Sequence, residues 1–390
     1  MSSRVQTGLE LLLSDPPASL RGARLGLIAH PASVLPDLTH AADALASHPG
    51  LDLRALFGPQ HGARGEKQDN MIESAHYCDP RTGVPVHSLY GAVRKPTAEM
   101  LEGLDALLFD LQDVGVRVYT FVWTMALAMQ ACGERGVRFV VLDRPNPVGS
   151  LREGCVLRPG FESFVGLFPV PLRHGLTAGE MARTLVGAMG VECDLEVISC
   201  AGLRRDSWLD ETGLPYVMPS PNLPTLDSCA VYPGTVLLEG TNLSEGRGTT
   251  RPFEIVGAPY LDADELAARL NARRLPGVSF RACWFEPTFQ KHAGMLCGGV
   301  QFHVSDRRSF KPVHATIALL RDAMDLSGGA FRWREPPYEY EAIKPPIDIL
   351  WGSTELREQL DAGAQPEDIL VAAPAELGRF EELVAPYLLS

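Results

Sequence analysis

The sequence predicts an α/β protein whose first 150 residues form a parallel sheet covered by helices on both faces. Short, almost continuously apolar runs alternate with helix-like segments there, and such runs are typical of parallel strands that are buried on both faces. The chain has 390 residues, which is long for one domain, so two domains are expected.

The expected elements follow in chain order. Strands are predicted at 23–29, 51–57, 84–89, 106–110 and 137–143, and helices at 38–47, 96–101 and 119–135. Proline at the start of 96–101 suits a first helical turn, where its missing N–H costs nothing. The irregular stretch 149–170 is interpreted as the crossing between an N-terminal domain, 1–160, and a C-terminal domain, 161–390.

The second half contains fewer strands. Thr177 and Glu180 match a capping box that starts a helix ending near residue 189. Strands are expected at 194–199, 278–285 and 299–304, and helices at 262–274, 312–325, 354–362 and 375–388. The proline-rich stretch 206–226 is predicted to be an extended loop over the surface or the cleft.

Composition excludes several classes of protein. A net charge of −13 argues against nucleic-acid binding, which needs clustered Lys and Arg. The eight cysteines form no CxxC pair, so a zinc ribbon or redox motif is not expected. The apolar run near the N-terminus is too short for a signal peptide or a membrane span. We therefore expect a cytoplasmic protein with no membrane partner.

Polar residues follow the predicted strands, where open α/β sheets bind ligands. In order, the strand ends present His30, then Gln60 and His61, then Tyr90, then 110–113, then 143–146. About half of them are also explained as caps of helices and turns. The polar, glycine-rich loop 57–70 is the strongest candidate because no hydrophobic core needs that composition.

Familiar cofactor motifs are missing. The sequence has no GxGxxG after a strand, no GxxxxGK[ST], no HExxH and no GxSxG, so no cofactor or metal is expected. Carboxylates remain, in three groups: Glu66, Asp69 and Glu73; Asp110 and Asp113; Glu239 and Glu245. Two carboxylates across a cleft suffice for glycoside hydrolysis. Purely structural roles are the alternative. Asp110 and Asp113 would then cap a helix, 245–248 would be only a turn, and Arg117 would be a structural ion-pair partner.

Five motifs in this order resemble the NamZ-type (YbbC-like) exo-β-N-acetylmuramidase family: GPQHGARGEKQDNMIES, TGVPVHSLYG, LLFDLQDVGVRVYTFVWTMALAM, VLDRPNPVG and LLEGTNLSEGRGTTRPFEIVGAP. The resemblance runs from about Leu25 to the C-terminus. It implies a Rossmann-like N-terminal domain, a smaller α/β C-terminal domain and a cleft between them. It also implies release of N-acetylmuramic acid from the non-reducing end of peptidoglycan fragments, without a metal or nucleotide.

The resemblance also suggests site residues. Many members carry PEHG in the first motif, whereas this chain has Gln60 in the acidic position, and glutamine cannot transfer a proton at neutral pH. Glu73 is then the favoured proton donor and Glu66 the other local candidate, with Tyr119 near the reacting centre. The expected substrate-binding residues are Gln60, His61, Arg64, Asp110, Asp113, Arg117, Asn146, Glu239, Asn242, Glu245 and Arg247.

The expected partner is a small peptidoglycan-derived saccharide that has already entered the cell. The alternative is a non-catalytic sugar-binding protein of the same fold, which Gln60 keeps open. An oxidoreductase or transferase is a more distant alternative, because the glycine fingerprint of dinucleotide binding is missing.

Overall fold

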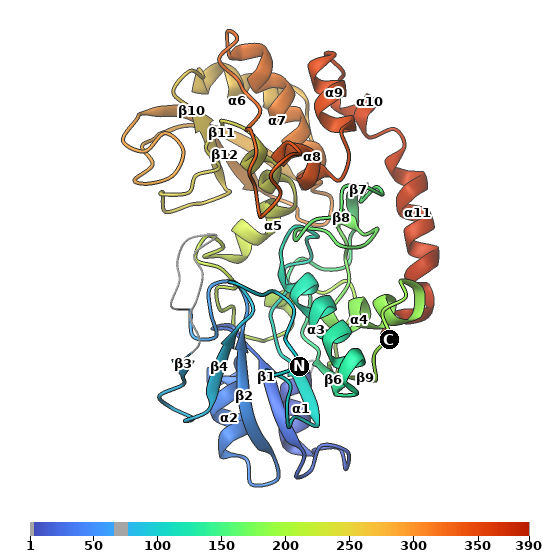
Figure 1. Ribbon diagram of the computed structural model, residues 1–390. Helices are drawn as coiled ribbons and strands as arrows, with labels where there is room; N and C mark the ends of the chain where they lie inside the picture. The colour runs from blue at the N-terminus through green and yellow to red at the C-terminus, as the bar shows by residue number, and fades with distance from the viewer. Residues whose placement is uncertain (1–3, 66–76, 390) are drawn as a thin grey trace.

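The N-terminal domain is built on a seven-stranded sheet in the computed structural model, which describes residues 4–65 and 77–389 (Figure 1). The strand order is β3-β4-β2-β1-β5-β6-β9, and every neighbouring pair is parallel except β3 with β4. The strands are β1 Arg24–Ile28, β2 Asp52–Gly58, β3 Tyr77–Cys78, β4 Pro85–Ser88, β5 Ala106–Phe109, β6 Arg138–Leu142 and β9 Leu195–Ile198. The predicted α/β class with a mostly parallel sheet is confirmed.

Helices cover both faces of this sheet. They are α1 Gly8–Ser14 and α2 Ala41–Ser47 on one face, and α3 Phe121–Arg135 and α4 Ala178–Ala188 on the other. The strands are apolar on both sides for this reason: in β5, Leu108 packs in the core with α1 and α2, whereas Leu107 and Phe109 pack in the core with α3. Burying both faces stabilises the sheet and leaves only its carboxyl edge for polar loops.

The C-terminal domain has a smaller antiparallel sheet of order β10-β12-β11. Its elements are α5 Leu226–Thr235, the 3₁₀ turn η2 Val236–Gly240, β10 Ile255–Ala258, α6 Ala263–Ala272, β11 Val278–Phe285, β12 Cys297–Val304, α7 Pro312–Leu326, α8 Pro346–Trp351, α9 Glu355–Asp361 and α10 Pro366–Ile369. Helices α6 and α7 pack together beside the sheet and α5 lies against α7. The two domains lie one above the other in Figure 1.

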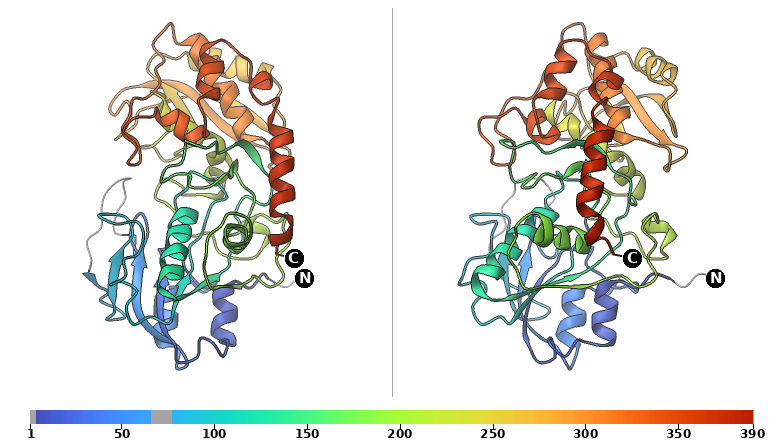
Figure 2. Two further views of the ribbon diagram at one scale, coloured as in Figure 1. Left: turned by 45° about the vertical axis from the view of Figure 1, so that its right-hand side comes forward. Right: turned by 90° about the vertical axis from the view of Figure 1, so that its right-hand side faces the viewer.

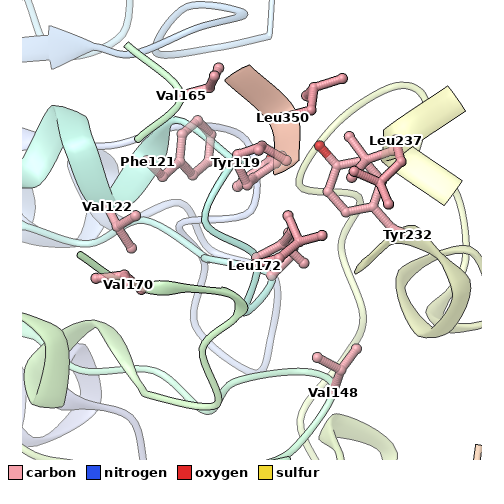
Figure 3. Close-up of a cluster of buried hydrophobic side chains, with 14 of the residues drawn as sticks. Tyr119, Phe121, Val122, Val148, Val165, Val170, Leu172, Tyr232, Leu237 and Leu350 are labelled. Atoms are coloured by element: carbon pink, nitrogen blue, oxygen red, sulfur yellow. The ribbon is translucent and has the colours of Figure 1, made fainter. Parts of the chain in front are cut away.

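One apolar core joins the two domains. Tyr119 precedes α3, Tyr232 belongs to α5 and Leu237 to η2, and these side chains lie together in Figure 3 with Leu350 of α8. The hairpin β7 Glu153–Val156 and β8 Pro171–Arg173 adds Leu172 to the same cluster. The junction is therefore packed like a domain interior.

The last helix, α11 Ala373–Val384, runs from the C-terminal domain along the N-terminal one (Figure 2). The 3₁₀ turn η3 Ala385–Tyr387 follows, and the hydroxyl of Tyr387 donates to the carbonyl of Gly187 in α4 at 2.7 Å. A Cβ at Gly187 would lie 2.0 Å from the Tyr387 ring, so the close approach requires glycine.

Most predicted elements are present, but β3, β7, β8, β10, α5, α8 and α10 were not predicted. Three further differences concern the N-terminal domain. The segment predicted as a helix at 96–101 forms only turns, and Gly103, with φ of 77°, ends them. Helix α1 was not predicted, although Thr7 and Glu10 form a complete capping box there. Strand β9 pairs with β6, so the N-terminal sheet takes in residues beyond the expected domain boundary at 160.

Candidate functional site

A pocket lies at the domain junction, beyond the carboxyl ends of β2 and β5. Its empty volume, which includes space open to solvent, is about 420 Å³, and water-sized spheres can occupy about 30 Å³ of it. Its lining residues are Gln60, His61, Val118, Tyr119, Thr120, Val165, Ser220, Leu223, Tyr232, Glu239, Arg247, Phe253, Tyr338 and Glu339. Five predicted site residues therefore share one pocket, and they come from both domains.

His61 occupies a sharp turn after β2. Its φ of 73° is in the left-handed region, which is uncommon for a residue with a side chain, and Gly62 follows with φ of 83°. The turn also needs Gly58, because a Cβ there would lie 2.8 Å from the backbone nitrogen of Ala63. The ring Nε2 of His61 lies 3.3 Å from the hydroxyl of Ser220. The loop 206–226, which was predicted to cross the surface or the cleft, thus supplies one wall.

Tyr119 fixes another part of the same loop. Its hydroxyl donates to the carbonyl oxygen of Pro219 at 2.5 Å. Its ring meets Phe121 edge-on with centroids 4.7 Å apart, and Tyr232 edge-on at 6.2 Å (Figure 3). Burial raises the pKa of Tyr119 well above its usual value, so the group is a neutral hydroxyl.

The C-terminal wall is a charged network. Arg247 Nη2 donates to Glu239 Oε1 at 2.8 Å, and the Tyr338 hydroxyl donates to Glu239 Oε2 at 2.8 Å. Arg247 Nε also pairs with Glu245 at 3.1 Å, and Lys291 donates to the other oxygen of Glu245 at 2.8 Å. Burial opposes ionisation of Glu245, but Lys291 and Arg247 hold its pKa below its usual value. These glutamates are thus fixed in place by cations.

Glu339 is a pocket residue that the sequence analysis missed. It follows Tyr338 in the proline-rich stretch before α8, and Tyr90 donates to its Oε2 at 3.1 Å. Burial, with Glu239 nearby, raises the pKa of Glu339 to about 7. The available signal was the YEYE run at 338–341, which has acids and aromatics in a segment without helix or strand periodicity.

Two predicted arginines have other partners. Arg64 donates to both oxygens of Asp79, at 3.1 and 2.9 Å, and pairs with Asp43 at 2.8 Å. Arg117 is fully buried, and its Nη groups donate to four backbone carbonyl groups, including that of Leu350 at 2.7 Å. Arg247 is therefore the one of the three predicted arginines that lines the described pocket.

The predicted acids at the other strand ends also lie outside the pocket lining. Asp110 forms a buried two-fold pair with Arg144, at 2.7 and 2.8 Å. Asp113 accepts from the backbone N–H of Gly115 at 2.7 Å and lies 3.3 Å from Nε2 of His174. These geometries fit structural roles at the base of the site.

The predicted amides are held by backbone groups. Asn146 donates to the carbonyl of Leu176 at 3.1 Å, and Asn242 donates to the carbonyl of Ala330 at 3.0 Å. Glu66, Asp69 and Glu73 lie outside the described residues.

Other features of the described chain offer no competing site of the predicted kind. A larger cavity, of which water-sized spheres can occupy about 270 Å³, lies between the β7–β8 hairpin, α7 and α11, and none of the predicted site residues lines it. Among residues 4–65 and 77–389, no three His, Cys, Asp or Glu side chains are grouped to hold a metal ion. No described helix is long and apolar enough to cross a bilayer.

The chain is similar to known proteins over almost its whole length. The chain is 45% identical over 388 residues to the peptidoglycan β-N-acetylmuramidase NamZ of Bacillus subtilis (strain 168), covering 99% of this chain and 91% of that protein. Two crystal structures of DUF1343 family proteins from Bacteroides fragilis superpose with TM-scores of 0.88 and 0.77, at 34% and 28% identity and 99% coverage of both chains.

Family profiles match almost the whole chain. The N-terminal profile of the exo-β-N-acetylmuramidase NamZ matches residues 25–227, and the C-terminal profile matches 230–389. The boundary between the two matches, at 227–230, falls after β9 and within α5. The chain therefore belongs to the exo-β-N-acetylmuramidase NamZ family.

Proposed function

We propose that this protein is an exo-β-N-acetylmuramidase that removes N-acetylmuramic acid from the non-reducing end of peptidoglycan fragments. The observation that carries the proposal is the pocket between the domains, which holds two buried glutamates, Glu239 and Glu339, in different electrostatic environments. Glycoside hydrolysis needs one carboxyl group that gives a proton and another group that stabilises or attacks the anomeric carbon. Family membership and the 45% identical relative support the same activity.

The lining of the pocket supports a site that holds its substrate from both domains. Gln60, His61 and Tyr119 line it from the N-terminal domain, and Glu239, Arg247 and Glu339 line it from the C-terminal domain.

The lactyl carboxylate of muramic acid needs a cation. Arg247 is the candidate, since it lines the pocket and its Nη1 has no hydrogen-bond partner within the described part of the chain. A guanidinium group suits carboxylate recognition because of its planar set of donors. His61 and Gln60 are proposed to contact the sugar from the N-terminal side.

Glu73 and Glu66 are proposed as further acids of this site, on the basis of the family resemblance and of their positions after His61 in the sequence. Tyr119 is proposed to hold the floor of the pocket near the reacting centre through Pro219. Cytoplasmic location also stays a prediction, which fractionation of cells of the source organism would test.

The direct test is hydrolysis of the disaccharide in which N-acetylmuramic acid is β-linked to N-acetylglucosamine. We expect both monosaccharides as products, identified by mass spectrometry, and only single muramic acid residues from longer glycans. Binding of the disaccharide without turnover would instead support a sugar-binding protein. Release of larger fragments would contradict the exo mode.

A further inference from the structure

The turn at 338–341 projects Glu339 into the pocket. Tyr338 and Glu341 exchange two backbone hydrogen bonds, at 2.8 and 2.9 Å, which close the turn. Glu339 and Tyr340 have φ values of 44° and 69°, so two consecutive residues with side chains adopt the left-handed region. Such a backbone is costly and persists only where the surroundings hold it. We propose that Glu339 is the catalytic acid, which protonates the leaving oxygen of the glycosidic bond; this inference rests on the proposed function.

A chain of hydrogen bonds from the N-terminal domain orients this carboxyl group. Thr120 Oγ1 donates to Gln60 Oε1 at 3.0 Å, and Gln60 Nε2 lies 3.4 Å from the hydroxyl oxygen of Tyr90. The Tyr90 hydroxyl donates to Glu339 Oε2 at 3.1 Å. An amide can accept and donate at once, whereas a carboxylate can only accept. Gln60 thus accepts from Thr120 and orients Tyr90 toward Glu339.

The charges around Glu339 suit a proton donor. Burial and the nearby Glu239 carboxylate raise the pKa of Glu339, while the hydrogen bond from Tyr90 and the charges of Arg247 and Arg94 lower it, with a balance at about 7. A carboxyl group with its pKa raised in this way carries a proton closer to neutral pH, as general acid catalysis there requires. Glu239 differs, because Arg247 and Tyr338 fix both of its oxygens.

In the proposed step, Glu339 protonates the sugar that leaves. The Oε–H bond of Glu339 breaks and its proton bonds to the glycosidic oxygen. The bond between that oxygen and C1 breaks, its electron pair stays on the oxygen, and the second sugar leaves as an alcohol. The oxygen of one water molecule finally bonds to C1, and the proton that this water releases returns to Glu339 directly or through solvent. The net reaction consumes one water.

A leaving-group comparison tests the role. We compare Glu339→Gln with the native protein on the natural disaccharide and on 2,4-dinitrophenyl β-N-acetylmuramide, whose leaving group departs without protonation. The expected loss of kcat is about 10²–10⁴-fold on the disaccharide and less than about tenfold on the dinitrophenyl glycoside. Glu335→Gln is the control, since this glutamate lies in the same segment and is exposed. Its kcat should match the native value on both substrates.

Two further variants keep the test decisive. Tyr90→Phe removes a hydrogen bond that favours the ionised carboxyl group, so the high-pH limb of kcat/KM should move to higher pH. If Glu73 is the acid instead, Glu73→Gln should lose kcat on the disaccharide and keep it on the dinitrophenyl glycoside. The Glu339 proposal is overturned if Glu339→Gln hydrolyses the disaccharide at the native rate. It is also overturned if the folded variant loses activity on both substrates to the same extent. A native protein that hydrolyses neither substrate would overturn the proposed function itself.

Discussion

Arg117 of the N-terminal domain donates from Nη2 to the carbonyl oxygen of Leu350 in the C-terminal domain at 2.7 Å. The same nitrogen reaches the carbonyl of Trp351 at 2.8 Å, and Nη1 reaches those of Cys155 and Val170. Burial lowers the pKa of Arg117 to about 10, so the group stays charged at neutral pH. One cation therefore satisfies buried acceptors on both sides of the domain junction.

Replacing this arginine should destabilise the whole protein. Arg117→Met leaves four buried carbonyl groups without their charged donor, and we expect a loss of about 3–5 kcal/mol in the free energy of unfolding, measured with urea. Arg135→Met is the control because Arg135 is exposed in the last turn of α3. A loss below about 1 kcal/mol for Arg117→Met would show that water replaces the guanidinium group.

Removing the hydroxyl of Tyr119 should act on the pocket through the loop that carries Ser220. Tyr119→Phe leaves the carbonyl of Pro219 without this donor, which costs about 1–3 kcal/mol. We expect kcat/KM on the disaccharide to fall at least tenfold. Tyr216→Phe provides the matched control, since it removes a hydroxyl that donates to Leu223 at 2.6 Å in the same loop. Equal effects of both variants on kcat/KM would argue against a special place for Tyr119.

Arg247 should determine the preference for muramic acid. We expect the native protein to favour β-N-acetylmuramides strongly over the N-acetylglucosamine analogues, since a site built for a charged group rejects ligands without it. In Arg247→Ala the ratio of the two kcat/KM values should fall at least tenfold. Arg64→Ala is the comparison, because its guanidinium group is paired with Asp43 and Asp79, and that variant should keep the native ratio. Equal native activity on both sugars would indicate a general hexosaminidase.

Asp143 should make stability depend on pH. Its carboxyl group accepts from the N–H of Gly179 and from the hydroxyl of Thr177, and burial raises its pKa from 3.8 to about 7. The folded state therefore binds this proton more tightly than the unfolded chain. The contribution of this proton to the free energy of unfolding is fully present below pH 3.8 and is lost as the pH rises through about 7.

Asp143→Asn removes this titration and can still bond to both groups. We compare how far the free energy of unfolding, measured with urea, falls between pH 4 and pH 8. The fall in the variant should be smaller than the fall in the native protein by a few kcal/mol. Asp264→Asn, at an exposed position in α6, should leave the native pH dependence unchanged. Parallel curves for Asp143→Asn and the native protein would mean that Asp143 is ionised in the folded state.

The fold was largely predictable because its strands carry a local signal. Runs such as ALLF in β5 are apolar at every position, and only a sheet covered on both faces accommodates that pattern. The wrong prediction of a helix at 96–101 has a local cause as well. Leu101 N–H bonds to Thr97, but the next bonds span only three residues and Gly103 ends the run, so the turn never propagates.

The site was predictable only in part. His61, Glu239 and Arg247 stand in polar, glycine-rich loops that neither a core nor a simple turn explains, and the sequence pointed to them for that reason. Arg64 and Arg117 stand in equally polar motifs, and only their partners in space distinguish them from Arg247. Glu339 was missed because a carboxyl group becomes a pocket residue through burial by distant segments, here those of Tyr90 and Glu239.

The course of α11 limits how a peptidoglycan fragment can enter the pocket between the domains. Arg152 of the hairpin pairs with Glu381 in α11 at 3.1 Å, and the segment after that helix is bonded to α4 through Tyr387. A clamshell motion of the two domains would have to detach this C-terminal segment or bend it. Entry by way of a preformed mouth, with small movements of the surrounding loops, avoids that cost. A chain shortened before α11 would lose both contacts and leave the two domains freer to move relative to one another.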